Sequence, residues 1–375
     1  MSIQQEHGLG QRVRRCTKVL LTLLSLVCTC ILVVQAGAQT PPREGDEVWK
    51  YIASLPTEQR LAVLEREAKR EASVVVYGTS AIDRANYYFE KFRKNYPDIK
   101  VEYVRLTTPQ LVDKVLIEYR TKRVNSDIIV ATVTWLDVLK DALAPYEITN
   151  WEDFYPEFRK GGRDLGWTAI VHEVFPSSIA WRTDRISRNE APKTLDQVSD
   201  LKWKGRVGRT SHLEIFIDSM IQVYGEKDAL EKLNKLAALE NRLYSSHAAL
   251  GEALGTGEID LAWDLGAHRP IQLKAAGAPV DWVFQDPLFG GGETFSATRG
   301  AKHPYAAAFV MESVLTAENL EYLDKKDPGH LLGNRKGTFT YPVSSLPKLI
   351  LERSIPENRA RENNRIAEQL FLRRR

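Results

Sequence analysis

Chemistry-bearing side chains gather in the segment LAWDLGAHRP, residues 261–270. Trp263 and Asp264 end a short apolar run, and His268 and Arg269 follow shortly after them. A carboxylate, an imidazole and a guanidinium this close in sequence can bind a metal ion, or they can hold a polar organic solute whose anionic group pairs with the cation. An ion pair between Asp264 and Arg269 that only ties the loop is the structural alternative. The residue types alone leave these readings open.

Polar residues also close other apolar runs. Thr79 and Ser80 end SVVVYGTS, where Ser80 and Asp83 fit a helix-capping box. The free N–H groups of such a helix start can also bind an anion, so both roles fit Ser80. Arg182, in AWRTD, suggests a solute that carries a carboxylate or a phosphate. The candidate ligand-binding residues are Thr79, Ser80, Thr134, Trp135, Arg182, Ser211, His212, Trp263, Asp264 and His268.

Some of these candidates have plain structural explanations. Trp135 follows an apolar run and fits a core residue as well as a ring that stacks on a planar ligand. His212 fits an ordinary surface or core histidine. The chain has no Gly-x-Ser-x-Gly elbow and no HExxH motif, and its 7 histidines are scattered. We therefore expect no catalytic residue, metal ligand or cofactor, and a secreted α/β hydrolase is the alternative of another class.

Alternating strands and helices position the candidates. The predicted strands cover residues 73–80, 99–104, 126–135, 177–183, 205–211, 258–264 and 280–287. Helical spacing connects them, with one helix starting at an N-cap Thr108 followed by Pro109 and a last helix at residues 361–375. This order predicts mainly parallel sheets flanked by helices, which bind ligands at the carboxyl ends of their strands.

The beginning of the chain predicts an export signal. Basic residues at 12–18 precede an apolar stretch at 19–34, and residues 36–38 are the small residues that a signal peptidase needs. The stretch is shorter than the ~20 residues that span a bilayer. We expect cleavage after Ala38, with retention as a membrane anchor as the alternative.

Cleavage would change the composition of the chain. The leader holds all 3 cysteines, so the exported protein would have no thiol for a disulfide or a metal. It also holds more basic than acidic residues, and its removal takes the formal charge from +3 to zero. A neutral chain gives no reason to expect nucleic acid as a partner.

Several segments, taken in order, resemble one family. The runs EASVVVYGTS, FRKNYPDIKVEYVRLTTPQLVDKVLIEYRTKRVNSDIIV, PKTLDQVSDLKWKGRVG, GTGEIDLAW, AAGAPVDWVFQDP and TRGAKHPYAAAFVMESVLTAEN are similar to extracellular solute-binding proteins of ABC importers, of the ferric-iron-type group. The resemblance covers residues 70–345. It implies an α/β, two-lobed periplasmic-binding-protein (type II) fold, each lobe a mainly parallel sheet flanked by helices, with hinge crossovers between them.

The resemblance also implies a function. Such a periplasmic protein would capture a small polar organic solute, anionic or zwitterionic, between its lobes and deliver it to an inner-membrane ABC permease. Delivery to a membrane sensor in place of the permease is an alternative that the sequence does not distinguish. We expect the protein to be a monomer. The predicted parts are a signal peptide at 1–38, a helical extension at 39–70, a first lobe at 71–170 and 285–375, and a second lobe at 171–284.

Iron is the alternative solute. Ferric-binding members usually carry adjacent tyrosines just after the strand that here reads IDLAW, because phenolate oxygens suit Fe³⁺. This chain has Trp263, Asp264, Leu265 and Gly266 there. Ferric iron or an iron chelate is therefore the secondary prediction.

Overall fold

The computed structural model describes residues 40–43 and 45–372 of the chain. The chain divides into two compact units, Met1–Arg43 and Glu44–Arg375, and the fold described below belongs to the second. The predicted leader at residues 1–38 lies outside the described residues. None of the helices within the described ranges has the length and apolar character needed to cross a membrane.

Parallel strands form the first lobe, as the alternating pattern predicts. β1 (Ser73–Gly78) lies between β2 (Lys100–Arg105) and β3 (Ile128–Thr132) and runs parallel to both. The connecting helices are α4 (Ile82–Asn95) and α5 (Thr108–Arg120). The N-cap of α5 is Thr107 and not the predicted Thr108, because the Gln110 side chain returns to the Thr107 backbone N–H at 3.0 Å.

The second lobe repeats this arrangement. β6 (Val207–Thr210) lies between β7 (Arg242–Tyr244) and β8 (Leu261–Gly266) and runs parallel to both. β9 (Val280–Phe284) pairs antiparallel with the end of β5 (Trp167–Arg182). The predicted strands at 177–183, 205–211, 258–264 and 280–287 therefore all correspond to strands of this lobe.

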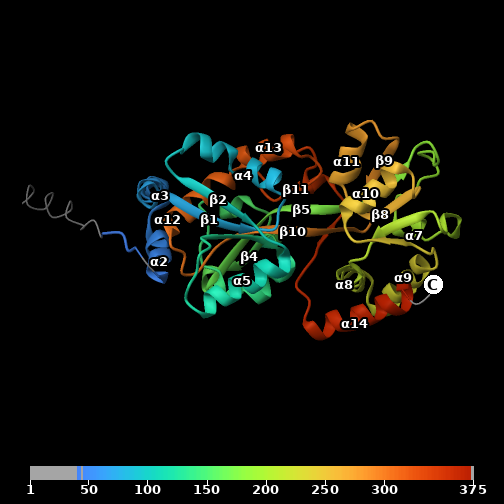
Figure 1. Ribbon diagram of the computed structural model, residues 1–375, viewed down its shortest axis with the longest axis horizontal. Coiled ribbons are helices and arrows are strands. Elements are labelled where there is room, and N and C mark those ends of the chain that lie inside the picture. The colour runs from blue at the N-terminus through green and yellow to red at the C-terminus, as the bar shows by residue number, and fades with distance from the viewer. Residues whose placement is uncertain (1–39, 44, 373–375) are drawn as a thin grey trace, which may run out of the picture. The chain divides into compact units, whose positions relative to one another are not determined.

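Two long strands connect the lobes, and Figure 1 shows both running between the two groups of helices. β5 pairs with lobe-one strands through its first half and with β8 and β9 through its second half. β10 (Leu288–Ala297) runs antiparallel to both β3 and β5. A short third strand, β12 (Leu349–Leu351), lies parallel to β10. The predicted strand at 177–183 is thus only the second half of a crossover that is buried along nearly its whole length.

Helices cover the sheets on their outer faces. The remaining helices and short strands are α2 (Asp46–Ser54), α3 (Thr57–Glu71), α6 (Leu136–Leu139), α7 (Leu195–Val198), α8 (Leu213–Tyr224), α9 (Glu226–Ala237), α10 (His247–Thr256), α11 (His268–Ala275), α12 (Pro304–Val314), α13 (Ala317–Lys326), α14 (Glu357–Ala367), β4 (Arg159–Gly162) and β11 (Leu331–Leu332). Helices α2 and α3 form the predicted N-terminal extension, and they pack on α12. α12 is buried on every side, which is why its sequence is apolar and alanine-rich instead of amphipathic.

The C-terminal helix differs from its predicted place. Residues 285–375 were assigned to the first lobe, but α14 packs against α8 of the second lobe. Ala367 and Phe371 join the apolar cluster around Trp203 and Phe216. The chain therefore returns to the second lobe after β12, and the other predicted lobe boundaries stay a prediction.

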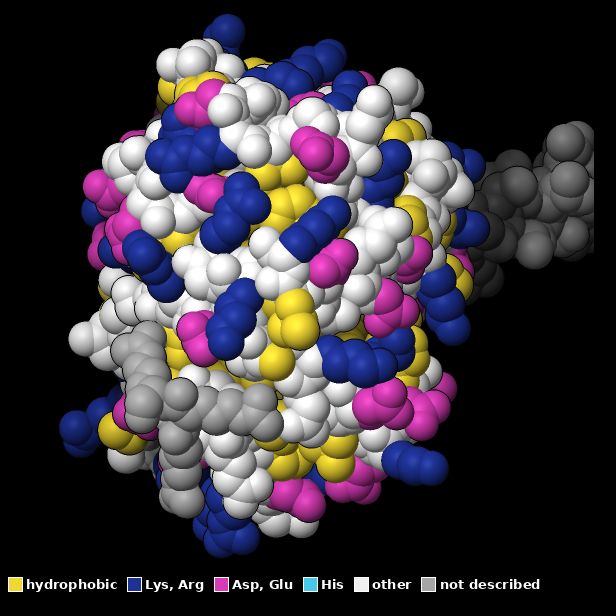
Figure 2. Space-filling model, turned by 90° about the vertical axis from the view of Figure 1, so that its right-hand side faces the viewer, with side chains coloured by type: hydrophobic (Ala, Val, Ile, Leu, Met, Phe, Trp, Pro, Cys, Tyr) yellow, Lys and Arg dark blue, Asp and Glu magenta, His cyan; other side chains and the backbone are white. Residues whose placement is uncertain are grey.

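The surface of the second-lobe end carries both signs of charge. On the face shown in Figure 2, Lys and Arg side chains alternate with Asp and Glu side chains around small hydrophobic areas. Such a mixed face offers no broad field of one sign to an extended polyanion.

Candidate functional site

Alternate residues of the two crossover strands point to one side. Phe175 lies opposite Gly291 and Glu173 opposite Glu293, and side chains two residues apart on a strand share a face. We call this side, formed by Glu173, Phe175 and Ser177 of β5 with Gly291 and Glu293 of β10, the crossover face. It lies where the two lobes meet, and residues from both lobes reach it.

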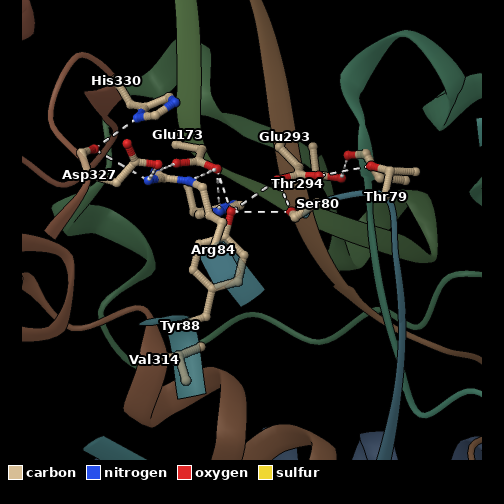
Figure 3. Close-up of polar contacts among 12 residues, drawn as sticks. Thr79, Ser80, Arg84, Tyr88, Glu173, Glu293, Thr294, Val314, Asp327 and His330 are labelled. Carbon is tan, nitrogen blue, oxygen red and sulfur yellow. Dashed lines mark hydrogen bonds and ion pairs between the residues drawn. The ribbon is translucent and has the colours of Figure 1, made fainter. Parts of the chain in front are cut away.

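Thr79 and Ser80, predicted as ligand residues, contact Glu293 of this face. The Thr79 hydroxyl donates to Glu293 Oε1 at 2.9 Å and the Ser80 hydroxyl to Oε2 at 2.6 Å (Figure 3). The Tyr88 hydroxyl of α4 lies 3.1 Å from Glu293 Oε2, while its single proton is directed to Glu173. Burial raises the pKa of Glu293, and the nearby Glu173 raises it further. The predicted Ser80–Asp83 capping box is absent, since Ala81 is the N-cap of α4 and makes no side-chain cap.

Beside this group, Arg84 of α4 anchors the first lobe to β5. Its guanidinium pairs with Glu173 and, at 2.7 Å, with Asp327 (Figure 3). Tyr88 donates to Glu173 Oε1 at 2.5 Å. Burial alone would raise the pKa of Glu173, but Arg84 and His172 outweigh it and hold that pKa well below the usual range. Glu173 therefore stays ionised, and its carboxylate is bound by Arg84 and Tyr88.

In the second lobe, Asp264 is tied to the crossover face. Ser177 donates to Asp264 Oδ1 at 2.8 Å, and the fully buried Arg209 donates to Oδ2 at 2.9 Å. Asp264 adopts φ 54°, the left-handed region that Asp tolerates better than most residues. The loop-tying ion pair considered from the sequence exists, but its partner is Arg209, 55 residues away, and not Arg269.

His268 connects the lobes through ring contacts. It begins α11 and stacks on His330, with ring centroids 5.0 Å apart, and both rings contact Phe175 edge-on. Burial, and then His330, lower the pKa of His268 well below its ordinary value, so this imidazole is neutral. A neutral ring cannot supply the cation that an anionic solute needs.

The sequence pattern did not predict three acidic groups at this site, Glu173, Glu293 and Glu352, and the last of them directly follows β12. A Cβ added at Gly291 would lie 2.9 Å from Glu352 Oε2, so this carboxyl lies over the crossover face. In the part of the chain that the structure describes, no hydrogen bond or ion pair reaches that carboxyl. Burial, followed by the charges of Asp264 and Glu214, raises the pKa of Glu352 to about 8.

Other predicted residues lie elsewhere or are already engaged. Arg182 pairs with Asp184 and donates to the Gly255 carbonyl at the end of α10, so its guanidinium is occupied. Trp263 is fully buried, and its indole N–H donates to Asn241 at 2.8 Å.

The last four predicted residues follow β3 and β6. Thr134 and Trp135 are half-buried after β3, where the Thr134 hydroxyl contacts that of Thr132 at 3.1 Å. Ser211 and His212 are exposed at the start of α8. These four remain candidates by position alone.

Acidic groups outnumber basic ones around the crossover face. The two buried arginines, Arg84 and Arg209, each pair with a carboxylate already. Glu293 and Glu352 form no ion pair with any described residue. The arrangement can therefore accept hydrogen bonds and positive charge. Each buried arginine at this face already pairs with a carboxylate, although Arg209 Nη1 has no hydrogen-bond partner among the described residues.

Known proteins place the chain in a family. The family model for bacterial extracellular solute-binding proteins matches residues 78–320. A comparison with curated proteins finds no match.

Solved structures share the fold at low sequence identity. Iron-bound HitA from Pseudomonas aeruginosa has a TM-score of 0.66 and 18% identity over 80% of this chain and 100% of its own. AfuA from Actinobacillus pleuropneumoniae, with fructose-6-phosphate bound, has a TM-score of 0.60 and 17% identity, over 79% of this chain and 97% of its own. The spermidine/putrescine substrate-binding protein PotD from Streptococcus pneumoniae has a TM-score of 0.63 and 14% identity, over 80% of this chain and 98% of its own. These neighbours confirm the two-lobed fold, and their solutes differ in kind.

Proposed function

Since the chain belongs to the family of bacterial extracellular solute-binding proteins, we propose that it captures an amine-bearing organic solute beside the crossover face and delivers it to an ABC importer permease. The ammonium group of the solute pairs with Glu352. The second carboxylate nearby, Asp264, is already paired with Arg209, so Glu352 is the group left for the amine. The site thus selects positive charge.

The Glu352 carboxyl carries this proposal. It lies over Gly291, has no donor among the described residues, and is held near Asp264 and Glu214. A half-buried carboxyl among acidic neighbours is costly unless a cation compensates it. A protonated amine supplies one charge and up to three N–H donors.

The residue types predict an anionic or zwitterionic solute, and Arg182 was one residue that suggested its acidic group. Arg182 is engaged by Asp184 and by helix-end carbonyls. The buried arginines near the crossover face are paired as well. A positively charged solute group therefore fits better than a purely anionic solute, and a zwitterion fits through its amine.

Both lobes would contribute to binding. Thr79 and Ser80 come from lobe one, while Asp264 and His268 come from lobe two. A solute that touches both stabilises the closed arrangement by its differential affinity for that form. Export through a leader cleaved after Ala38 would place the exported protein in the periplasm.

Calorimetry and thermal shift test the solute class. Polyamines and basic amino acids should raise the melting temperature of the wild-type protein, and organic acids, sugar phosphates and ferric citrate should not. Glu352→Gln should weaken amine binding at least about tenfold, which is the ~1.4 kcal/mol expected of a charge-assisted contact. Glu258→Gln, which alters an exposed carboxylate beside Arg242, is the control and should change nothing. A shift with anions alone would refute the amine proposal.

A further inference from the structure

A β-bulge places an extra histidine beside two buried glutamates. Glu173 lies opposite Glu293 and Val171 opposite Thr294, so His172 has no partner on β10. A bulge of this kind leaves one residue unpaired and changes the direction of its side chain, so the regular alternation between the two faces of the strand is interrupted there. His172 Nε2 consequently lies 3.5 Å from Glu173 Oε1, although neighbouring residues of a regular strand point to opposite faces.

The imidazole of His172 is a buried polar group without a hydrogen bond to any residue that the structure describes. Its side chain is fully buried, and neither ring nitrogen finds a hydrogen-bond partner within the described residues. Tyr88 and Phe295 contact the ring edge-on at centroid distances of 5.1 and 4.7 Å. Leaving a buried polar group unpaired is unfavourable, so an unpaired imidazole directed at carboxylates points to a missing ligand.

The donor spacing fits a metal ion. One donor atom from each of His172, Glu173 and Glu293 lies within 4.8 Å of the other two. Two ligands that each sit about 2.1 Å from a tetrahedral zinc ion are about 3.4 Å apart. The 3.5 Å between His172 Nε2 and Glu173 Oε1 matches that spacing and is too long for a good hydrogen bond.

The formal charges also favour a divalent ion. Arg84 supplies one positive charge, while its two partners Glu173 and Asp327 supply two negative charges. Glu293 adds a third carboxyl group, so the formal count is three carboxyl groups to one guanidinium, or minus two before the imidazole is included. A divalent cation brings this buried group to neutrality.

We propose that His172, Glu173 and Glu293 bind one Zn²⁺-like divalent ion inside the first lobe. Each of these side chains is at most 2% exposed, so the ion is retained and is not the delivered solute. Through Glu293, the ion holds the Thr79 and Ser80 hydroxyls in place. The site therefore couples a buried ion to the loop between β1 and α4.

Metal analysis of the wild-type protein is the first test. Protein purified without chelator, or chelated and then incubated with Zn²⁺ and desalted, should contain one ion per chain by mass spectrometry. Added Zn²⁺ should raise the melting temperature of the chelated protein. Co²⁺ should give the visible absorption bands of a tetrahedral nitrogen–oxygen site. Wild-type protein that binds no stoichiometric ion under these conditions refutes the proposal.

Matched glutamate variants make the second test. Glu293→Gln keeps the shape of the side chain and one of its two accepting oxygens, but it should weaken Zn²⁺ binding at least about 100-fold, more than loss of a supporting outer contact. His172→Gln should act in the same direction. Glu312→Gln is the control, since Glu312 is also buried and accepts from a tyrosine and a threonine, Tyr146 and Thr149, both at 2.6 Å. Unchanged Zn²⁺ affinity in folded Glu293→Gln would overturn the assignment.

Discussion

The carboxyl of Glu352 should give the folded protein a pH dependence in the neutral range. Burial and two acidic neighbours raise its pKa to about 8, whereas an unfolded chain has a glutamate pKa near ~4.3. Between these values the folded protein binds the extra proton, so this group lowers stability as pH rises from about 5 to 8. Glu352→Gln carries no such penalty. Urea denaturation should show it gaining stability over wild type through this range and levelling off above it.

A pH-independent difference between Glu352→Gln and wild type would contradict this assignment. Glu258→Gln, at an exposed carboxylate, should follow the wild-type profile throughout. An amine solute should also bind more tightly as Glu352 loses its proton, by up to tenfold per pH unit below about 8.

Asp264 supports a second prediction for a single residue. Its carboxylate is the only ion-pair partner of the fully buried Arg209 among the described residues. Asp264→Asn tolerates the left-handed backbone but leaves that guanidinium uncompensated, which should lower the free energy of unfolding by about 3 kcal/mol. Ser177→Ala removes one hydrogen bond to Asp264 and should cost about 1 kcal/mol. Equal stability of Asp264→Asn and wild type would mean that the pair does not hold the loop.

Among the elements, the contact between α11 and the loop before β11 depends on Gly329. Its φ is 104°, and a Cβ there would lie 2.7 Å from the His268 Cα at the start of α11. Gly277, with φ 85°, has open space around the same position. Gly277→Ala should cost about 1 kcal/mol for backbone strain alone. Gly329→Ala should cost about 1–3 kcal/mol more, because α11 must move away. Similar losses in both variants, measured by denaturation, would show that the elements are not in close contact.

At the scale of the whole molecule, export should determine the chemistry of the functional protein. If the leader is cleaved after Ala38, N-terminal sequencing of periplasmic protein should begin at Gln39. Iodoacetamide should then label no residue under denaturing conditions, since every cysteine lies in the leader. A functional protein that retains the leader would be labelled and would behave as a membrane-anchored form.

Much of the fold was predictable from local pattern. The apolar runs at 73–80, 126–135 and 258–264 correspond to β1, β3 and β8. A short, continuous apolar run between two helical segments is typical of a buried parallel strand, so local sequence was enough to predict these three. The long crossover β5 was only half predicted, since a strand buried on both faces shows no alternation to mark its start. Thr79 and Asp264 could be placed near the site because strand ends gather at one edge of a sheet.

The sequence by itself determined the alternating elements, the family resemblance and the loops that end the parallel strands. Only the tertiary structure decided which charges meet. Arg209 replaced Arg269 as the partner of Asp264, and Arg182 was directed away from the crossover face. Glu173, Glu293 and Glu352 come from strands far apart in the chain, and a single bulge turns His172 toward the first two. Pairing between distant strands and a one-residue register shift leave no mark in local sequence, so the electrostatics of the site emerge only when the chain has folded.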